Sequence, residues 1–299
     1  MTRLIAKGSN YFDDPKYPIA VRSVTTSSGE VSHEHDLTEI EHAHDFCELT
    51  LVTKGHAMHW LEGDEFPITA GDAFILQDQQ SHYFHQRKDL ELINIMYDPK
   101  QLELPENRLR KMPGYCAIFL LEPLFRKQHR FSSHLHLNRL ELSQAERMAQ
   151  RMEKENTLKP EGFEVALLSG LLDLMVFLSR LYEKTDSTNA NALLRVGNVI
   201  GAIENDYAKD WNVEDFSKIA GMSRSTLMRV FKRATGQAPV EYLNQQRLQK
   251  AMQLLRSTRM PVSQIAFEVG FNDSNYFTRH FKKSQGMPPL SYRTSHSET

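Results

Sequence analysis

The sequence contains little cysteine and no long uninterrupted apolar run. Only two of the 299 residues are cysteines, Cys47 and Cys116, which is too few for a disulfide-stapled secreted domain. This count favours a reducing compartment, and we expect a cytoplasmic protein. The N-terminal segment MTRLIAKGSNYFDDP lacks the apolar core of a signal peptide. The longest apolar stretch, 165–181, is broken by small and acidic residues, so it predicts a packed helix rather than a membrane span.

A large net charge is also absent, because 36 Lys and Arg nearly balance 38 Asp and Glu to give −2. The charge is unevenly distributed, however. Residues 190–299 hold 15 Lys and Arg against 9 Asp and Glu, a net of +6, and residues 1–189 hold 21 against 29, a net of −8. A basic C-terminal third is typical of a tethered nucleic-acid-binding module, although a chance excess of surface charge would give the same numbers.

The N-terminal part reads as short strands. Apolar or alternating runs cover 48–53, 58–63, 72–77 and 91–97, with turn signals at Lys54-Gly55, Gly63-Asp64 and Ala70-Gly71-Asp72. Strands at this spacing predict a small antiparallel barrel or sandwich. Residues 98–139 contain several prolines, and we expect them to be irregular.

The periodicity changes after residue 140. Apolar residues then recur every three or four positions, and Ser143 with Glu146 has the spacing of a capping box, so we expect a helix from Ser143. A second helix is expected over 161–182, followed by a polar linker over 183–191. The predicted organisation is therefore a β-domain over 1–139, connector or dimerisation helices over 140–182, the linker, and an all-α domain over 192–299.

The all-α region repeats itself with an offset of 50 residues. The offset aligns identical or similar residues in two segments: Arg229 with Arg279, Phe231 with Phe281, Lys232 with Lys282, Arg233 with Lys283, Gly236 with Gly286, Pro239 with Pro289 and Tyr242 with Tyr292. So many matches at one offset indicate one supersecondary unit used twice.

Each unit has the pattern of a helix-turn-helix. In the first, a short helix over 213–220 precedes a helix capped by Ser223 and stopped at Gly236; in the second, a helix over 262–270 precedes one capped by Asp273 and ending near Gly286. We expect the pairs Leu227/Phe231 and Phe277/Phe281 to face inward. The opposite faces then carry side chains suited to bases and phosphates: Arg224, Ser225, Met228, Arg229 and Lys232 in one unit, and Ser274, Asn275, Thr278, Arg279 and Lys282 in the other. Two helical hairpins with ordinary solvated faces are the alternative.

This region resembles the DNA-binding domain of the AraC/XylS family of bacterial transcription regulators. The resemblance covers about 100 residues and rests on a signature that includes Ser223, Leu227, Phe231, Gly236, Pro239, Arg247, Ile265-Ala266, Val269-Gly270-Phe271, Tyr276-Phe277, Arg279, Gly286, Pro289 and Tyr292-Arg293. It implies seven helices, with a central helix over about 240–256 and two recognition helices that enter the major groove of double-stranded DNA one turn, ~34 Å, apart.

Carried over by position, the resemblance implies base contacts from Arg224, Ser225, Met228 and Arg229, and in the second unit from Asp273, Asn275 and Arg279. Met228 differs from the other positions because its side chain is apolar, and the base group that such a side chain can contact is the methyl group of thymine. The resemblance also implies a homodimer and contact with RNA polymerase.

A histidine constellation marks the N-terminal strands. Eight of the 13 histidines lie between His33 and His85, and His42, His44 and Glu48 give an H-x-H-x₃-E spacing that predicts one shared strand face. With a second segment from Gly71 to His82, this is similar to the two motifs of cupin barrels. The second motif departs from the cupin pattern, since Gln77, Gln79 and Gln86 stand where the family prefers Pro, Gly and Asn.

The cupin resemblance makes His42, His44, Glu48 and His82 a ligand set for a divalent metal such as Fe, Mn, Ni or Zn. A catalytic metal, a metal that helps to hold a ligand, a metal-free polar pocket for a small effector, and purely structural histidines all stay open, with the metal-free pocket favoured. Trp60 is a further candidate effector residue, because an indole can stack on a sugar ring.

Residues 89–164 are also loosely similar to the rhamnose-responsive activators of the same family. We therefore expect a DNA-binding regulator, an activator rather than an enzyme, whose barrel senses a small molecule such as a monosaccharide. The rival hypotheses are a cupin metal enzyme fused to a DNA-binding module and a regulator whose barrel only dimerises.

Overall fold

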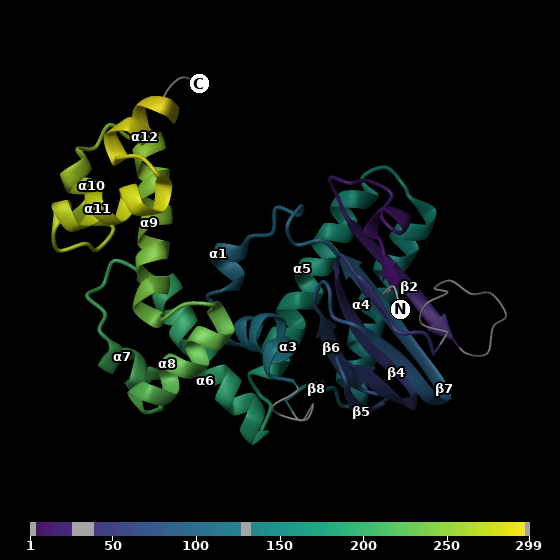
Figure 1. Cartoon of the computed structure of the whole chain (residues 1–299). Coiled ribbons are helices and arrows are strands. Elements are labelled where there is room, and N and C mark those ends of the chain that lie inside the picture. The colour runs from purple at the N-terminus through teal and green to yellow at the C-terminus, as the bar shows by residue number, and fades with distance from the viewer. Residues whose placement is uncertain (1–3, 26–38, 127–132, 297–299) are drawn as a thin grey trace. The chain divides into compact units, whose positions relative to one another are not determined.

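A computed structural model of the chain describes residues 4–25, 39–126 and 133–296. The chain divides into two compact units, residues 1–197 and 198–299, and each is treated by itself. The first is β-rich and the second is helical, which confirms the predicted fold class (Figure 1).

The N-terminal unit is built on one bent sheet. Its strands are β1 (Leu4–Ala6), β2 (Ile19–Thr25), β3 (His42–His44), β4 (Cys47–Leu61), β5 (Asp64–Thr69), β6 (Asp72–Leu76), β7 (His82–Tyr97) and β8 (Leu135–His136), with a 3₁₀ turn at Gly8–Asn10. The order along the sheet is β1-β3-β7-β4-β6-β8, with β2 added to β7 and β5 added to β4. The long antiparallel β4–β7 ladder holds the sheet together.

The turn predicted at Lys54-Gly55 is wrong. Residues 48–53 and 58–63 were expected to form two strands, but β4 runs through both, with register shifts between Val52 and Met58. Gly55 has φ 72°, and a Cβ atom there would collide with the backbone carbonyl of Asp89. Glycine at this position therefore permits a β-bulge rather than a reversal of the chain.

Residues 98–139 are more regular than predicted. They contain α1 (Glu106–Leu109) and a helical run made of α2 (Pro113–Tyr115), a π-helical turn (Cys116–Leu121) and α3 (Glu122–Phe125). Prolines at the first positions of helical turns start helices instead of breaking them, as Pro113 does here. The run is buried, since Cys116, Ala117 and Leu121 have no exposed surface.

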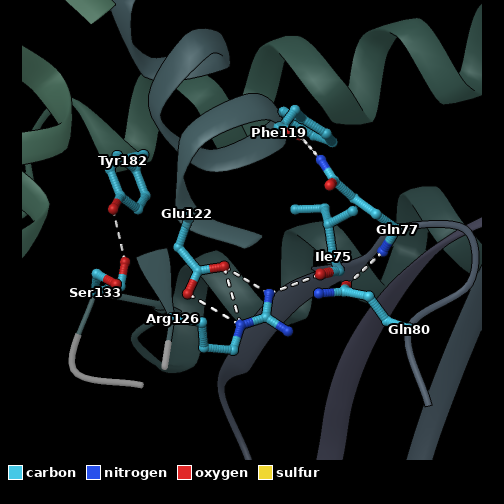
Figure 2. A network of polar contacts seen from close by, with 8 residues as sticks. All are labelled: Ile75, Gln77, Gln80, Phe119, Glu122, Arg126, Ser133 and Tyr182. Atoms are coloured by element: carbon cyan, nitrogen blue, oxygen red, sulfur yellow. Dashed lines mark hydrogen bonds and ion pairs between the residues drawn. The ribbon is translucent and has the colours of Figure 1, made fainter. Parts of the chain in front are cut away.

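A buried ion pair fastens this helical run to the sheet, as Figure 2 shows. Arg126 donates to Glu122 across one helical turn and to the carbonyl of Ile75 in β6 at 2.6 Å, and both charged side chains are 1% exposed. Nearby, the Gln77 side chain donates to the Phe119 carbonyl at 3.5 Å. The Tyr182 hydroxyl donates to the Ser133 carbonyl at 2.6 Å, and burial raises the pKa of Tyr182.

Two long helices, α4 (Arg139–Leu158) and α5 (Phe163–Tyr182), pack together and against the sheet (Figure 1). α4 begins four residues earlier than predicted, because Asn138 and Glu141 form the capping box instead of Ser143 and Glu146. Side chains of α4 also bind backbone N–H groups of β2: Asn156 accepts from Val21 at 2.8 Å and Glu153 from Ser23 at 2.6 Å. These bonds satisfy donors that a sheet edge leaves open.

α5 is apolar enough to resemble a membrane-crossing helix, with a mean hydropathy of 1.7 in its most apolar window. It nevertheless buries Leu167, Leu171, Leu174 and Leu178 completely or nearly so within the N-terminal unit. After α5, the expected linker 183–191 is not entirely coil, because α6 (Thr188–Asn205) begins inside it. Burial of Ala190 and Leu193 explains why this polar run becomes helical.

The C-terminal unit continues with α7 (Val213–Ala220), α8 (Arg224–Thr235), α9 (Pro239–Ser257), α10 (Val262–Glu268), α11 (Ser274–Gln285) and α12 (Pro289–His296). With α6, the described residues supply the seven helices that the family resemblance implies. The central helix α9 carries Arg247, which is 8% exposed and donates to the carbonyls of Tyr207 and Lys209 at 2.8 Å. Burial lowers the pKa of this guanidinium, which nevertheless anchors the loop before α7.

Candidate functional site

The predicted repeat is confirmed in three dimensions. α8 and α11 are both 12 residues long and start exactly one repeat apart, with Ser223 and Asp273 as their N-caps. Both end at a glycine with positive φ, Gly236 at 77° and Gly286 at 74°, a conformation that glycine adopts without strain.

The inward faces of the two helices also match. Leu227, Phe231, Phe277 and Phe281 have no exposed surface. Phe231 meets Tyr242 edge-on with ring centroids 5.7 Å apart at 78°, and Phe281 meets Tyr292 in the same way at 5.4 Å and 77°. The same aromatic contact therefore fixes each helix on the helix that follows it, which leaves the opposite face turned away from the core.

The outward faces carry the residues expected to contact DNA. Seven of the eleven are basic or polar and exposed, namely Arg224, Ser225, Arg229, Lys232, Asn275, Arg279 and Lys282, while Met228, Ser274 and Thr278 are half-buried and Asp273 is exposed. Several of these side chains already have local partners, among them Asp273 and Thr278. The Asp273 carboxylate caps α11 by accepting from the Tyr276 N–H, and the Thr278 hydroxyl donates to the Ser274 carbonyl at 2.8 Å.

One aromatic pair on α11 was not among the predicted site residues. The Tyr276 ring lies 4.3 Å from the His280 ring, and Tyr276 is 40% exposed. Burial, together with the nearby cations Lys283 and Arg279, lowers the pKa of His280. The i, i+4 spacing of two rings on a basic helix is the signal that could have identified them.

In the N-terminal unit the structure brings together three of the four predicted metal ligands. His44 and His82 approach each other at 3.2 Å between their Nε2 atoms, and ligand atoms of His44, Glu48 and His82 all lie within 4.8 Å of one another. All three side chains are buried. Two imidazoles and a carboxylate at these distances fit a divalent transition metal.

The fourth predicted ligand, His42, is buried but stands outside this set. Its ring lies 4.4 Å from that of His82, while its Nδ1 is 3.1 Å from the Ile40 carbonyl. The expectation that His42, His44 and Glu48 share one strand is wrong. The chain bends after β3, and Glu48 belongs to β4.

Trp60 lies away from the buried histidines. It is half-buried and stacks on Tyr83 at 5.1 Å, whereas its neighbour His59 is fully buried and lies 5.5 Å from the ring of His82. Successive side chains on a strand point to opposite faces, so Trp60 and His59 are on different sides of β4. His59, Thr50 and Asn94 are buried polar residues of the interior that were not predicted. His33 and His35 lie outside the described residues.

A second cluster was also missed. Asp72 Oδ1 is 2.8 Å from His134 Nε2 and 2.7 Å from His136 Nδ1. Burial raises the pKa of Asp72, but the hydrogen bonds from the two histidines and from the Thr69 N–H outweigh burial, so the pKa lies below its ordinary value. The H-x-H spacing at 134 and 136 was the available signal, but it gave no indication of Asp72 as the partner.

Comparison with known proteins covers both units. Residues 28–152 match the AraC-like ligand binding domain family, and residues 216–295 match a helix-turn-helix domain family. The chain is 30% identical over 256 residues to the HTH-type transcriptional activator RhaR of Enterobacter sp. (strain 638), covering 85% of this chain and 86% of that protein. RhaR of Salmonella schwarzengrund (strain CVM19633) is 30% identical over 255 residues, with the same coverage.

Among solved structures, the C-terminal domain of the two-component response regulator yesN from Fusobacterium nucleatum is 34% identical. The match covers 32% of this chain and 93% of the yesN domain, with a TM-score of 0.31. The sequence matches in both units and the full-length relatives together establish the family. The chain belongs to the AraC family of transcriptional regulators, with an AraC-like ligand-binding domain followed by a helix-turn-helix DNA-binding domain.

Proposed function

We propose that the protein is a cytoplasmic transcription activator that works as a homodimer with RNA polymerase. It reads DNA with α8 and α11, and it responds to a small molecule held in the N-terminal barrel. The observation that carries the DNA-reading part is the matched pair of helices. Each has a side-chain N-cap and a glycine C-cap, the same buried aromatic contact, and exposed basic residues on the outer face. The relatives are named transcriptional activators, which supports activation.

We assign base reading chiefly to Arg229 and Asn275, and phosphate contact to Lys232 and Lys282. Arginine is bidentate to guanine and asparagine to adenine, whereas a lysine ammonium meets phosphates regardless of sequence. Arg224 is a weaker candidate because it already lies 3.4 Å from Glu214 in an exposed ion pair. Asp273 contributes through the cap, since a carboxylate repels phosphates.

The test compares Arg229→Ala and Asn275→Ala with Lys232→Ala, by titrating full-length protein into cognate and scrambled duplexes at several salt concentrations. We expect the first two to weaken cognate binding by about 1–3 kcal/mol and to reduce discrimination. Lys232→Ala should weaken both duplexes alike and flatten the salt slope by about one. Arg256→Ala, at an exposed arginine of α9, is the matched control. Unchanged discrimination in the first two variants would contradict the base-reading assignment.

For the barrel we propose a monosaccharide-class effector bound among the buried polar residues His44, Glu48, Thr50, His82 and Asn94. Hydroxyl groups of a sugar both donate and accept hydrogen bonds, and imidazole, carboxylate and amide groups offer complementary acceptors and donors. If a divalent metal takes part, His44, Glu48 and His82 would hold it. No enzymatic activity is proposed, because the relatives are regulators.

The variant His44→Ala tests the sensing role. We expect loss of the transcriptional response to the effector with unchanged DNA binding in its absence, because only the interior hydrogen-bonding set is altered. The control is His85→Ala, at a histidine 3.3 Å from Glu65. A reporter assay with candidate sugars and a DNA-binding titration without sugar give the two readouts. Normal induction in His44→Ala would remove the buried histidines from the sensing site.

A further inference from the structure

A second group of metal-ligand side chains lies at the sheet edge where β8 pairs with β6. His134 and His136 both approach one oxygen, Asp72 Oδ1, at 2.8 and 2.7 Å. The register of the two strands places Asp72 opposite His136. His134 lies in the bend just before β8, and its ring reaches the same carboxylate oxygen as the ring of His136. This cluster uses none of the residues of the His44, Glu48 and His82 set.

Asp72 is held firmly in this position. It is 2% exposed, and its second oxygen accepts a hydrogen bond from the Thr69 N–H at 2.7 Å. Gly71 allows the two strands to approach: it has φ 102°, and a Cβ atom there would lie 2.6 Å from the Leu137 carbonyl and 2.9 Å from the His136 ring. A buried carboxylate with one oxygen fixed by the backbone and the other turned to two imidazoles is a preorganised ligand set.

The cluster opens onto space that can complete a coordination shell. A cavity of about 510 Å³ is lined by Asp72, His134 and His136 together with Thr69, Gln86, His56 and apolar residues of β4 and β5. The side chains of His134 and His136 are 20% and 56% exposed, whereas that of Asp72 is 3% exposed. The cavity therefore gives solvent or a small ligand access to the two imidazole rings beside the buried carboxylate.

We propose that Asp72, His134 and His136 bind a first-row divalent transition metal, in addition to the effector and DNA sites. Two imidazoles and one carboxylate are donors that Zn²⁺, Co²⁺, Ni²⁺ and Fe²⁺ accept, whereas Mg²⁺ and Ca²⁺ prefer oxygen ligands only. Bonds of about 2.0–2.1 Å require ligand atoms roughly 2.9–3.4 Å apart. The two distances from Asp72 Oδ1 to the imidazole nitrogens, 2.7 and 2.8 Å, therefore have to lengthen by only a few tenths of an ångström as the metal replaces the two hydrogen bonds, and all three donor atoms already lie within 4.8 Å of one another.

Binding also fixes the histidine tautomers. His134 would coordinate through Nε2 with a proton on Nδ1, and His136 through Nδ1 with a proton on Nε2. The N–H protons that the two rings donate to Asp72 without metal therefore leave the coordinating nitrogens, either to the other ring nitrogen or to solvent. The alternative is a purely structural role, in which the two histidines only fasten β8 to Asp72 by hydrogen bonds.

The experiment uses tag-free full-length protein stripped with a chelator and titrated with Zn²⁺ by calorimetry. We expect the wild type to bind one more equivalent of Zn²⁺ than His136→Ala, and we expect His134→Ala to lose the same equivalent. Loss of a residue that only supports a ligand lowers metal affinity by up to about 100-fold. Loss of a direct ligand should therefore lower the Zn²⁺ affinity of this site by at least that factor. His136→Gln serves as a second variant at this exposed position and should lose the same equivalent, because it removes the imidazole donor but keeps a polar side chain.

Two matched variants locate the metal. His56→Ala removes a cavity-lining histidine outside the cluster, and His82→Ala removes one ligand of the interior set; both should keep the equivalent that His136→Ala loses. In His82→Ala, where the interior set has lost a ligand, bound Cu²⁺ should show two nitrogen couplings by electron paramagnetic resonance, and one when His136→Ala is added. The proposal is overturned if the wild type binds no Zn²⁺, if His136→Ala binds as much as wild type, or if His56→Ala weakens the site equally. None of these outcomes affects the DNA-reading proposal, which is measured by duplex binding.

Discussion

Single residues explain where this barrel departs from the cupin pattern. Gln79 and Gln86 stand where that pattern has Gly and Asn, and both have positive φ, 67° and 50°. Glycine and asparagine are the residues that adopt this left-handed region most readily, so the pattern preserves a backbone conformation rather than a side-chain function. This chain keeps the conformation with glutamine, which carries a local energetic cost.

We therefore predict that Gln79→Gly raises the free energy of unfolding. Left-handed backbone costs a non-glycine residue about 1–2 kcal/mol, and the greater freedom of glycine in the unfolded chain cancels part of the gain, so about 0.5–1 kcal/mol should remain. Urea unfolding measures the difference. Gln150→Gly on the exposed face of α4 is the control and should lower stability by about 1 kcal/mol. A destabilised Gln79→Gly protein would show that the glutamine side chain outweighs the backbone cost.

At the scale of elements, a buried guanidinium links the end of the helical run 113–125 to the sheet. Arg126 bridges Glu122 and the Ile75 carbonyl, so a helix turn and a strand end share one guanidinium (Figure 2). Gly114 on the same run donates its N–H to Glu183 at 3.0 Å, just beyond α5. The run therefore connects the barrel wall with the end of the connector helix.

We expect Arg126→Met to lower the free energy of unfolding by about 3–5 kcal/mol, because it leaves the Glu122 carboxylate buried without its cation. The double variant Glu122→Leu with Arg126→Met should recover most of that loss, since neither charge is then buried. Chemical denaturation of both variants gives the comparison. Equal stability of the two proteins would mean that the bond to Ile75, rather than charge pairing, holds the run in place.

At the scale of the whole molecule, α5 bears on assembly. One side of the helix is buried within the N-terminal unit, while Val165, Leu168, Leu172 and Val176 form a second stripe at helical spacing that is exposed or half-buried. Val165 is 63% exposed. This stripe supports the proposed homodimer, which would place two DNA-binding units on paired sites and raise their effective concentration.

The prediction is that Leu172→Lys converts the protein to a monomer, because a lysine charge would have to enter an apolar contact. Analytical ultracentrifugation measures the change, and affinity for a two-site duplex should fall more than affinity for a single site. Asp173→Lys, one residue away at an exposed position outside the stripe, is the charge-matched control. A Leu172→Lys protein that sediments as a dimer would place the contact elsewhere.

The sequence by itself determined the two helix-turn-helix units of this protein. Caps, glycine stops and i, i+4 apolar pairs act within one turn of helix, so Ser223, Gly236, Asp273 and Gly286 mark the ends of α8 and α11 without knowledge of the fold. Because of the 50-residue repeat, the helix ends predicted in one unit could be compared with those predicted in the other.

Only the tertiary structure decided the arrangement of the barrel. Asp72 meets His134 and His136 across 62 and 64 residues, and Gly55 forms a bulge because of the backbone of Asp89, not because of its neighbours in sequence. Strand register and bulges depend on which distant strand lies alongside, which no local pattern records. For that reason the sequence correctly predicted that several histidines gather on the N-terminal strands. It wrongly placed His42 in the ligand set, and it overlooked His59 and the Asp72 cluster.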